Sequence, residues 1–350
     1  MNVGPLKVVI AWPGLPYYAA RVIAEAVRKY PDAKFTVITT KSKIPYLGVD
    51  HVALAPVIRV DAGSVLSWRE LGLQVPDLYL LTSWEYRGFM SLARDVSVKP
   101  GGLIICMVDN YFYGKLKQWV GAIYFRLYLR RLYDYMLVPG VRSKWFMHFL
   151  GMPKSRVFIG NYTADPDIFY SPREQDSRSG VLFVGQFIER KGVRIIIETL
   201  CSAQGEKYAS SMRLIGSGPL GELLVSNGLF VEGFKQAPEL GMAYRESSVL
   251  LLPSVRDHWG VVAHEAALCG CLIIATRQCG CVDDLVEHGV NGYIMENCSK
   301  SELLRALEWH DALTEARMLR GRAVSLAKAS FFSPHNWAEN LAKMDPRLRG

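Results

Sequence analysis

The segment VGQFIERKG at 184–192 combines a glycine turn with two adjacent cations. It follows an apolar run and opens a predicted helix. Gly185 therefore allows a tight turn, and Arg190 and Lys191 fall beside the free N–H groups of the helix start. Cationic side chains at a helix N-terminus suit a diphosphate group. The alternative is an ordinary pair of surface cations at a helix start.

A second segment, DHWGVVAHE at 257–265, carries one carboxylate in a predicted loop and another in a predicted helix. Asp257 follows a strand and turn, whereas Glu265 lies within an apolar stretch. A carboxylate in apolar surroundings is costly unless it has partners, and two sugar hydroxyls would supply them. The alternative is that Glu265 is capped by neighbouring backbone or pairs with His264.

A third segment, CGCVDDLV at 279–286 followed by GVNG at 289–292, supplies a glycine turn near a helix start and again suits an anion. The Cys-x-Cys pairs at 269–271 and 279–281 also invite a zinc interpretation. Their spacing differs from the usual Cys-x2-Cys and both flank a predicted buried strand, so we expect packing cysteines. We assign no Asp-x-Asp motif to Mg²⁺ or Mn²⁺ and expect neither a metal nor a cofactor.

Short apolar runs that alternate with helix-length segments must position these residues. The predicted buried strands are 6–11, 35–39, 78–81, 103–108, 181–184, 213–215, 249–252 and 272–275. The segments between them are helical, among them 17–30, 115–135, 239–247 and 262–269. This alternation predicts an α/β fold of two doubly wound parallel sheets, and ligands of such sheets bind beyond the carboxyl ends of the strands.

The polar stretch 165–180 interrupts the alternation, which then restarts. We therefore predict a first domain at 1–168, a linker at 169–180 and a second domain at 181–333, with a C-terminal helix at 334–350 that crosses back to the first domain. The expected site is the cleft between the two domains.

The chain of 350 residues has a net charge of +8, which favours acidic partners. Much of this surplus lies between 115 and 156, where nine Lys or Arg and one acid are interleaved with aromatic residues. The bases expected on one face are Lys115, Lys117, Arg126, Arg130, Arg131, Arg142 and Lys144. Such a face suits an anionic membrane surface; the alternative is a solvated helix whose aromatic residues pack on the sheet.

The seven cysteines show no disulfide-scaffold spacing, and the longest apolar runs are too short or too polar to span a bilayer. We expect a cytoplasmic protein that is peripheral to the inner face of the cell membrane.

Four segments together resemble the retaining glycosyltransferases of the GT-B fold, family GT4. They are VGQFIERKG, IGSGPLGELL, LPSVRDHWGVVAHEAALCG and CGCVDDLVEHGVNGY, which match in order and spacing over about 181–294. The resemblance implies two Rossmann-like domains and metal-independent, hexosyl-type transfer from a nucleotide-diphosphate sugar with retention. The implied acceptor is a glycan or lipid-linked precursor in cell-surface polysaccharide or lipopolysaccharide biosynthesis.

The resemblance also implies roles for individual residues. Arg190 and Lys191 correspond to ligands of the donor diphosphate, and Glu265 to the carboxylate that holds the ribose. Asp257 takes the place of the family's first Glu, near the donor sugar. The implied catalytic set is completed by Asp109 of the first domain. The other implied donor-binding residues are Gly14, Gly185, Gln186, Gly216, His258, Trp259, Gly260 and Val261.

Three alternatives remain open. The motif GSGPLG at 216–221 is formally a dinucleotide-binding G-x-G-x-x-G, but it opens the second strand–helix unit of its domain, and its acid would have to be Glu239. A non-enzymatic, basic membrane-binding scaffold would use only the cationic face, and no nucleic-acid-binding module is recognisable. A 2-epimerase or phosphorylase of the same fold is the third.

Overall fold

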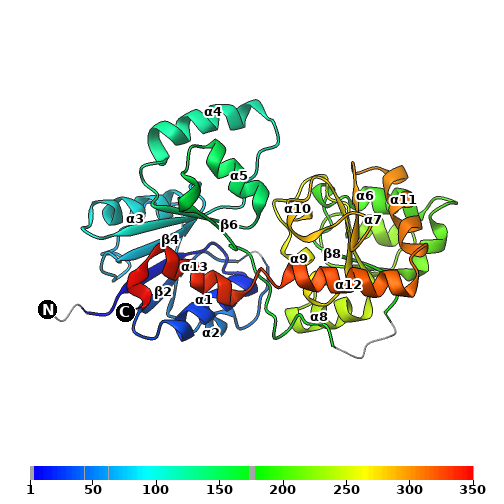
Figure 1. Ribbon diagram of the computed structural model, residues 1–350, viewed down its shortest axis with the longest axis horizontal. Coiled ribbons are helices and arrows are strands. Elements are labelled where there is room, and N and C mark those ends of the chain that lie inside the picture. The colour runs from blue at the N-terminus through cyan, green and yellow to red at the C-terminus, as the bar shows by residue number, and fades with distance from the viewer. Residues whose placement is uncertain (1–3, 43, 62, 173–177, 350) are drawn as a thin grey trace. The chain divides into compact units, whose positions relative to one another are not determined.

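A computed structural model describes residues 4–42, 44–61, 63–172 and 178–349. The chain divides into two compact units (Figure 1). Unit 1 consists of Met1–Thr163 with Phe332–Gly350, and unit 2 consists of Ala164–Phe331. The linker predicted at 169–180 falls partly on residues 173–177, which lie outside the described residues.

Unit 1 is built on one sheet of seven parallel strands in the order β3-β2-β1-β4-β5-β6-β7. The strands are β1 (Lys7–Ala11), β2 (Lys34–Thr39), β3 (Val57–Arg59), β4 (Leu78–Thr82), β5 (Leu103–Met107), β6 (Tyr135–Val138) and β7 (Val157–Ile159). The helices are α1 (Tyr17–Lys29), α2 (Val49–Val52), α3 (Arg87–Val98), α4 (Leu116–Tyr124), the π-helix η1 (Phe125–Leu129), α5 (Val141–Phe149), the 3₁₀ turn η2 (Lys154–Arg156), α13 (Pro334–Met344) and the 3₁₀ turn η5 (Pro346–Arg349).

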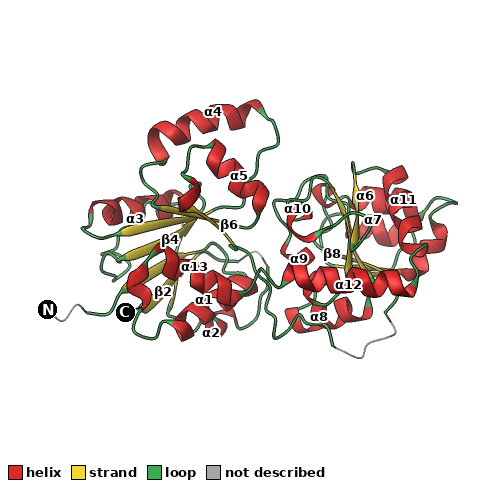
Figure 2. Ribbon diagram, viewed as in Figure 1, coloured by secondary structure: helices red, strands yellow, loops and turns green. Residues whose placement is uncertain are grey.

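Helices cover both faces of this sheet (Figure 2). Parallel strands buried on both faces are continuously apolar. In β1, Val8 and Ile10 enter one core cluster while Val9 enters the other. The C-terminal helix α13 packs beside α1, and the Tyr30 hydroxyl donates to the Ala338 carbonyl at 3.0 Å (Figure 1). The end of the chain is therefore part of unit 1.

Unit 2 is built on six parallel strands in the order β10-β9-β8-β11-β12-β13. The strands are β8 (Val181–Val184), β9 (Met212–Ile215), β10 (Val231–Glu232), β11 (Val249–Leu252), β12 (Leu272–Thr276) and β13 (Gly292–Met295). The helices are the 3₁₀ turn η3 (Glu189–Lys191), α6 (Val193–Leu200), the 3₁₀ segment η4 (Glu206–Ser211), α7 (Gly221–Ser226), α8 (Ala237–Glu246), α9 (Val261–Leu268), α10 (Val282–Leu285), α11 (Lys300–Asp311) and α12 (Glu315–Ala329).

The two doubly wound parallel sheets confirm the predicted fold class. The predicted helix 115–135 is wrong at its end, because the helical segment stops at Leu129 and strand β6 begins at Tyr135. Between them, Asp134 accepts a hydrogen bond from the Ile104 N–H at 2.8 Å and fixes the start of β6 beside β5. Within the described ranges, none of the helices combines the length and apolar character that crossing a bilayer requires.

Candidate functional site

The candidate site of unit 2 lies at the carboxyl ends of β8 and β11. These strands are adjacent, and the order of the sheet reverses there, since β9 and β10 lie on one side and β12 and β13 on the other. Doubly wound sheets bind ligands at such a switch point. The loop after β8 carries Arg190 and Lys191, and the loop after β11 carries Asp257.

The structure brings these three side chains together. Lys191 Nζ lies 2.5 Å from Asp257 Oδ2, and Arg190 Nη1 lies 3.8 Å from Asp257 Oδ1. The side chains of Lys191 and Asp257 are 14% and 10% exposed, whereas that of Arg190 is 40% exposed. Two cations and one carboxylate leave a local surplus of positive charge, which suits a phosphate group.

Close backbone contacts hold the two loops against each other. The Val255 N–H donates to the Arg190 carbonyl at 2.9 Å. Gly192 has a φ of +75°, and a Cβ on it would lie 1.9 Å from the Pro253 carbonyl oxygen. Glycine is therefore required at 192 both for the backbone conformation and for the close approach.

The main chain of Asp257 is fixed in the same way by the loop after β12. Its N–H donates to the Gln278 carbonyl at 3.2 Å, and its carbonyl accepts from the Gly280 N–H at 3.0 Å. A Cβ on Gly280 would lie 1.8 Å from the His258 carbonyl oxygen. The carboxylate beside Lys191 thus projects from a backbone that is tied on both sides.

Glu265 lies on α9, the helix that begins after Gly260. Its Oε2 accepts a hydrogen bond of 2.9 Å from the hydroxyl of Tyr244, a buried residue of α8. Burial raises the pKa of the Glu265 carboxyl to about 7, although the hydrogen bond from Tyr244 lowers it. A carboxylate in this environment is stabilised by further donors, and two sugar hydroxyls are such donors.

The neighbouring His264 is bonded to other parts of unit 2. Its Nδ1 accepts from the Ala164 N–H at 2.9 Å, and its Nε2 lies 2.9 Å from the Ala329 carbonyl oxygen. Burial lowers the pKa of His264 to about 4. This neutral imidazole joins the first residue of unit 2 to the end of α12. Glu265 accepts its hydrogen bond from Tyr244 instead.

The other predicted donor-binding residues of unit 2 differ in how exposed they are. Gln186 is exposed, and Gly185, Gly216, His258, Gly260 and Val261 are half-buried. Trp259 differs, because its indole is buried and its Nε1 donates to Asp284 Oδ2 at 2.9 Å. The structure therefore assigns the Trp259 side chain to the core and leaves only its backbone for a ligand.

Packing explains the G-x-G-x-x-G pattern at 216–221. A Cβ on Gly216 would lie 1.9 Å from the Gly185 carbonyl oxygen, and a Cβ on Gly218 would lie 2.6 Å from the Phe187 carbonyl oxygen. These glycines let the loop after β9 lie directly on the loop after β8, and no dinucleotide is needed to account for them.

The predicted residues of the first domain lie at the carboxyl edge of the other sheet. Gly14 follows β1, has a φ of +71°, and donates its N–H to Thr40 Oγ1 at 3.1 Å. Asp109 follows β5, and its Oδ2 accepts from the Tyr162 hydroxyl at 2.9 Å. Both belong to unit 1.

The cysteines of the two Cys-x-Cys pairs are buried, and none of these four forms a disulfide. Cys271 Sγ donates to the Tyr244 carbonyl at 3.0 Å, and burial raises the pKa of Cys279 to about 11. In the part of the chain that the structure describes, no group of three or more His, Cys, Asp or Glu is arranged to hold a metal ion. These thiols pack around β12.

Tyr244 is the residue of this site that sequence reasoning missed. Its position within α8 carries no motif, and only the tertiary contact between α8 and α9 brings its hydroxyl to Glu265. The helical period of α8, on which Gly241 and Tyr244 share a buried face, was the available signal that Tyr244 points inward.

Comparisons with known proteins find similarity to glycosyltransferases. Residues 178–310 match the family model "Glycosyl transferases group 1". An uncharacterized glycosyltransferase of Methanocaldococcus jannaschii is 32% identical over 157 residues, which are 43% of this chain and 42% of that protein. A D-inositol 3-phosphate glycosyltransferase of Mycolicibacterium smegmatis is 24% identical over 215 residues, 54% of this chain and 46% of its own length. The chain thus spans less than half the length of these curated relatives.

Solved structures extend the likeness of fold to both units. HepE of Anabaena in complex with UDP has a TM-score of 0.75 at 16% identity, covering 98% of this chain and 100% of HepE. A lipopolysaccharide outer core galactosyltransferase, WaaB, has a TM-score of 0.66 at 15% identity, covering 97% and 99%. Residues 178–310 therefore carry the pattern of the group 1 glycosyl transferases, and the chain has the GT-B fold.

Proposed function

We propose that this protein is a retaining glycosyltransferase of family GT4 that transfers a hexose from a nucleotide-diphosphate sugar to a glycan or lipid-linked acceptor. The observation that carries the proposal is the arrangement at the switch point of unit 2. Arg190, Lys191 and Asp257 meet there, and Glu265 projects from the helix that follows Asp257 in the chain. The match of residues 178–310 to the group 1 glycosyl transferases supports it.

In the proposed reaction, the bond between the anomeric carbon and the diphosphate oxygen breaks, and negative charge develops on the leaving diphosphate. Lys191 and Arg190 stabilise that charge, so no divalent metal is required. The acceptor hydroxyl attacks from the same face, and the leaving phosphate takes its proton. Glu265 grips the ribose and fixes the donor in this orientation.

A uridine nucleotide and a cell-surface glycan are the substrates that the relatives favour. The HepE structure contains UDP, and WaaB is described as a lipopolysaccharide galactosyltransferase. We therefore propose a UDP-sugar as the donor and a polysaccharide or lipopolysaccharide precursor as the acceptor.

A thermal-shift panel of UDP, GDP, ADP and their sugars tests the proposal. A ligand at 100 times its Kd adds about 2.7 kcal/mol of apparent stability, which is readily measured. We expect one nucleoside diphosphate to raise the Tm, with the shift unchanged in EDTA. If no nucleotide raised the Tm, the proposal would be contradicted. Release of a free epimer or a sugar phosphate would favour the epimerase or phosphorylase alternative.

A further inference from the structure

The helical segment formed by α4 and η1 has a buried face and, opposite it, an apolar stripe that faces solvent. The inward residues, all buried or half-buried, are Gln118, Ala122, Phe125 and Leu129. The outward residues, which we call the outer stripe, are Leu116, Val120, Ile123 and Leu127, with exposed fractions of 78%, 62%, 62% and 66%. Both sets have the spacing of one helix face, and a surface helix normally has polar residues opposite its buried stripe.

Exposed aromatic rings extend this apolar surface. Tyr124 and Tyr128 are 54% and 67% exposed, and their ring centroids lie 5.0 Å apart. Trp119 is 50% exposed, and its ring lies edge-on to Phe112 at 5.3 Å. These rings are held in place by packing while much of each faces solvent. Amphipathic rings of this kind are favoured at the boundary between lipid headgroups and acyl chains.

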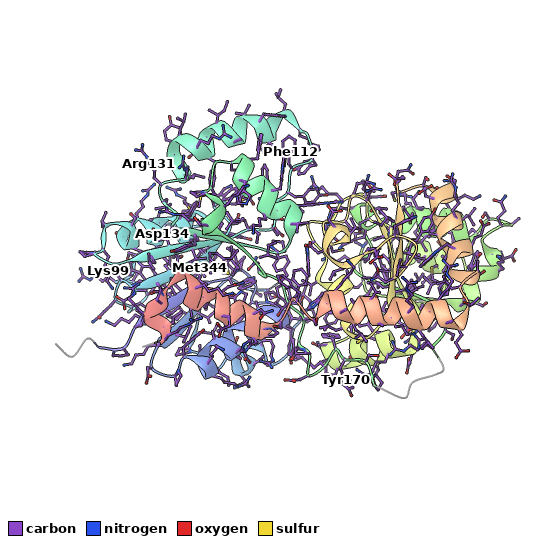
Figure 3. All side chains as sticks on the ribbon, in the orientation of Figure 1. Lys99, Phe112, Arg131, Asp134, Tyr170 and Met344 are labelled. Atoms are coloured by element: carbon purple, nitrogen blue, oxygen red, sulfur yellow. The ribbon has the colours of Figure 1, made fainter. Side chains whose placement is uncertain are left out.

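Cations surround the outer stripe. Five exposed bases lie on or beside the same segment: Lys115, Lys117, Arg126, Arg130 and Arg131. Asp134, the single acid between 115 and 156, is half-buried and accepts from the Ile104 N–H, so it is engaged with the sheet. The surface is therefore both apolar and strongly basic. Figure 3 labels Arg131, one of these bases, at one end of the segment.

We propose that α4 and η1 form an interfacial helix that binds an anionic lipid surface. The outer stripe enters the headgroup–acyl boundary, and the five bases contact lipid phosphates. Charge complementarity favours an anionic lipid surface over a second copy of the chain, because two copies would place the same cations opposite one another. The exposed aliphatic residues of the outer stripe add nothing to phosphate or base contacts, which disfavours a nucleic acid.

The same helix is linked to the candidate acceptor edge of unit 1. The loop after Asp109 is fastened to α4 by Gln118, whose Nε2 donates to the Tyr111 carbonyl at 2.8 Å and whose Oε1 accepts from the Tyr113 N–H at 2.9 Å. A lipid-linked acceptor in the bound membrane would thus lie near the strand end that carries Asp109. This last step rests on the proposed function, whereas lipid binding does not.

Vesicle co-sedimentation of the full chain tests the proposal. The probes are vesicles of phosphatidylcholine alone and of phosphatidylcholine mixed with phosphatidylglycerol. The stripe variant replaces Leu116, Val120, Ile123 and Leu127 by Gln, and the charge variant replaces Lys117, Arg130 and Arg131 by Gln. The matched control, Val225→Gln with Phe230→Gln, removes two apolar side chains of unit 2 that are 62% and 77% exposed.

We expect the native chain and the control to bind only the anionic vesicles. The stripe and charge variants should each lose at least about tenfold in affinity, and the native binding should weaken with salt. Absence of native binding, or a stripe variant that binds as tightly as the native chain, would overturn the proposal. So would a native dimer in lipid-free buffer that the stripe variant dissociates. A native far-UV circular dichroism spectrum and a cooperative thermal transition in both variants show that they are folded. Because vesicle binding is measured without nucleotide, its outcome is independent of the test of the proposed function.

Discussion

Lys191 and Asp257 lie 66 residues apart in the chain, and their side chains meet at 2.5 Å. The carboxylate takes one side of the ammonium group and lies near the Arg190 guanidinium. The family pattern predicts that Asp257 faces the donor sugar; the structure places its carboxylate on the cations that would bind the diphosphate. Asp257 is thus well placed to orient Lys191.

Replacing Asp257 by Asn separates orientation from charge. The variant removes a negative charge beside the expected diphosphate, so we predict that the Kd for the nucleoside diphosphate stays equal to the native value or falls a few-fold. Because Lys191 loses the group that fixes it, kcat should fall by about tenfold or more, which corresponds to about 1.4 kcal/mol. Steady-state kinetics and titration calorimetry measure the two effects, and a parallel loss of affinity and turnover would contradict the assigned role.

Replacing Glu265 by Gln should stabilise the empty protein at alkaline pH. The folded-state pKa of about 7 lies above the ordinary 4.5, so the folded chain keeps a proton that the unfolded chain releases. The stability contributed by this proton is complete below about pH 4.5 and is lost as the pH rises through 7. The Gln variant removes that dependence. Its Tm at pH 8 should exceed the native Tm. If the difference in Tm between the variant and the native chain were the same at pH 6 and pH 8, the prediction would be wrong.

Replacing Tyr244 by Phe removes the hydroxyl that donates to Glu265 and leaves the ring packing intact. Since that hydrogen bond lowers the pKa of Glu265, we expect the pKa to rise further and nucleotide binding to require a higher pH. The loss of affinity near pH 7 should be about three- to tenfold, which corresponds to about 0.7–1.4 kcal/mol and lies within the usual net contribution of one hydrogen bond. Tyr208→Phe, elsewhere in unit 2, is the control. A pH profile of the Kd that does not move would refute the positioning role.

Replacing His264 by Ala should destabilise unit 2, because the Ala164 N–H and the Ala329 carbonyl both lose a buried partner. Each unsatisfied group costs about 1–3 kcal/mol. The folded-state pKa of about 4 lies below 6.5, so the native histidine contributes stability that is complete above pH 6.5 and is lost as the pH falls through 4. Between pH 4 and 7, the Tm of the variant should change less steeply with pH than the Tm of the native chain. Equal slopes of Tm against pH would contradict this contribution of His264.

The periodic pattern of apolar runs was sufficient to predict the doubly wound sheets. It missed β3, β7, β10 and β13, which are only two to four residues long and lie at sheet edges, where burial leaves a weaker pattern. It also missed β6, an interior strand that begins at Tyr135, where the predicted helix 115–135 was expected to end. The π-helix η1 was also missed. A π-helix differs from an α-helix by one added residue in a turn, and the apolar spacing of the sequence does not reveal that addition.

The residues of the candidate site that directly follow strand ends could be predicted from the sequence. Arg190, Lys191 and Asp257 come directly after β8 and β11, and parallel strands bring such loops together. The partner of Glu265 was not predictable, because Tyr244 reaches it through the packing of one helix on another. The aromatic residues between 115 and 156 fall into three groups. Phe125, Tyr133 and Phe146 are buried, Tyr135 and Phe149 are half-buried, and Trp119, Tyr124, Tyr128 and Trp145 are exposed.

The most direct test of the account is calorimetric titration of the tightest-binding nucleoside diphosphate against the native chain, Lys191→Met, Glu265→Gln and the control Arg194→Gln. Arg194 is an exposed cation of α6 that is paired with Glu189, so its removal matches the charge change at Lys191. We expect the Lys191 and Glu265 variants each to lose about tenfold or more in affinity, while the control binds like the native chain. Native affinity in both variants would contradict the assignment of this site.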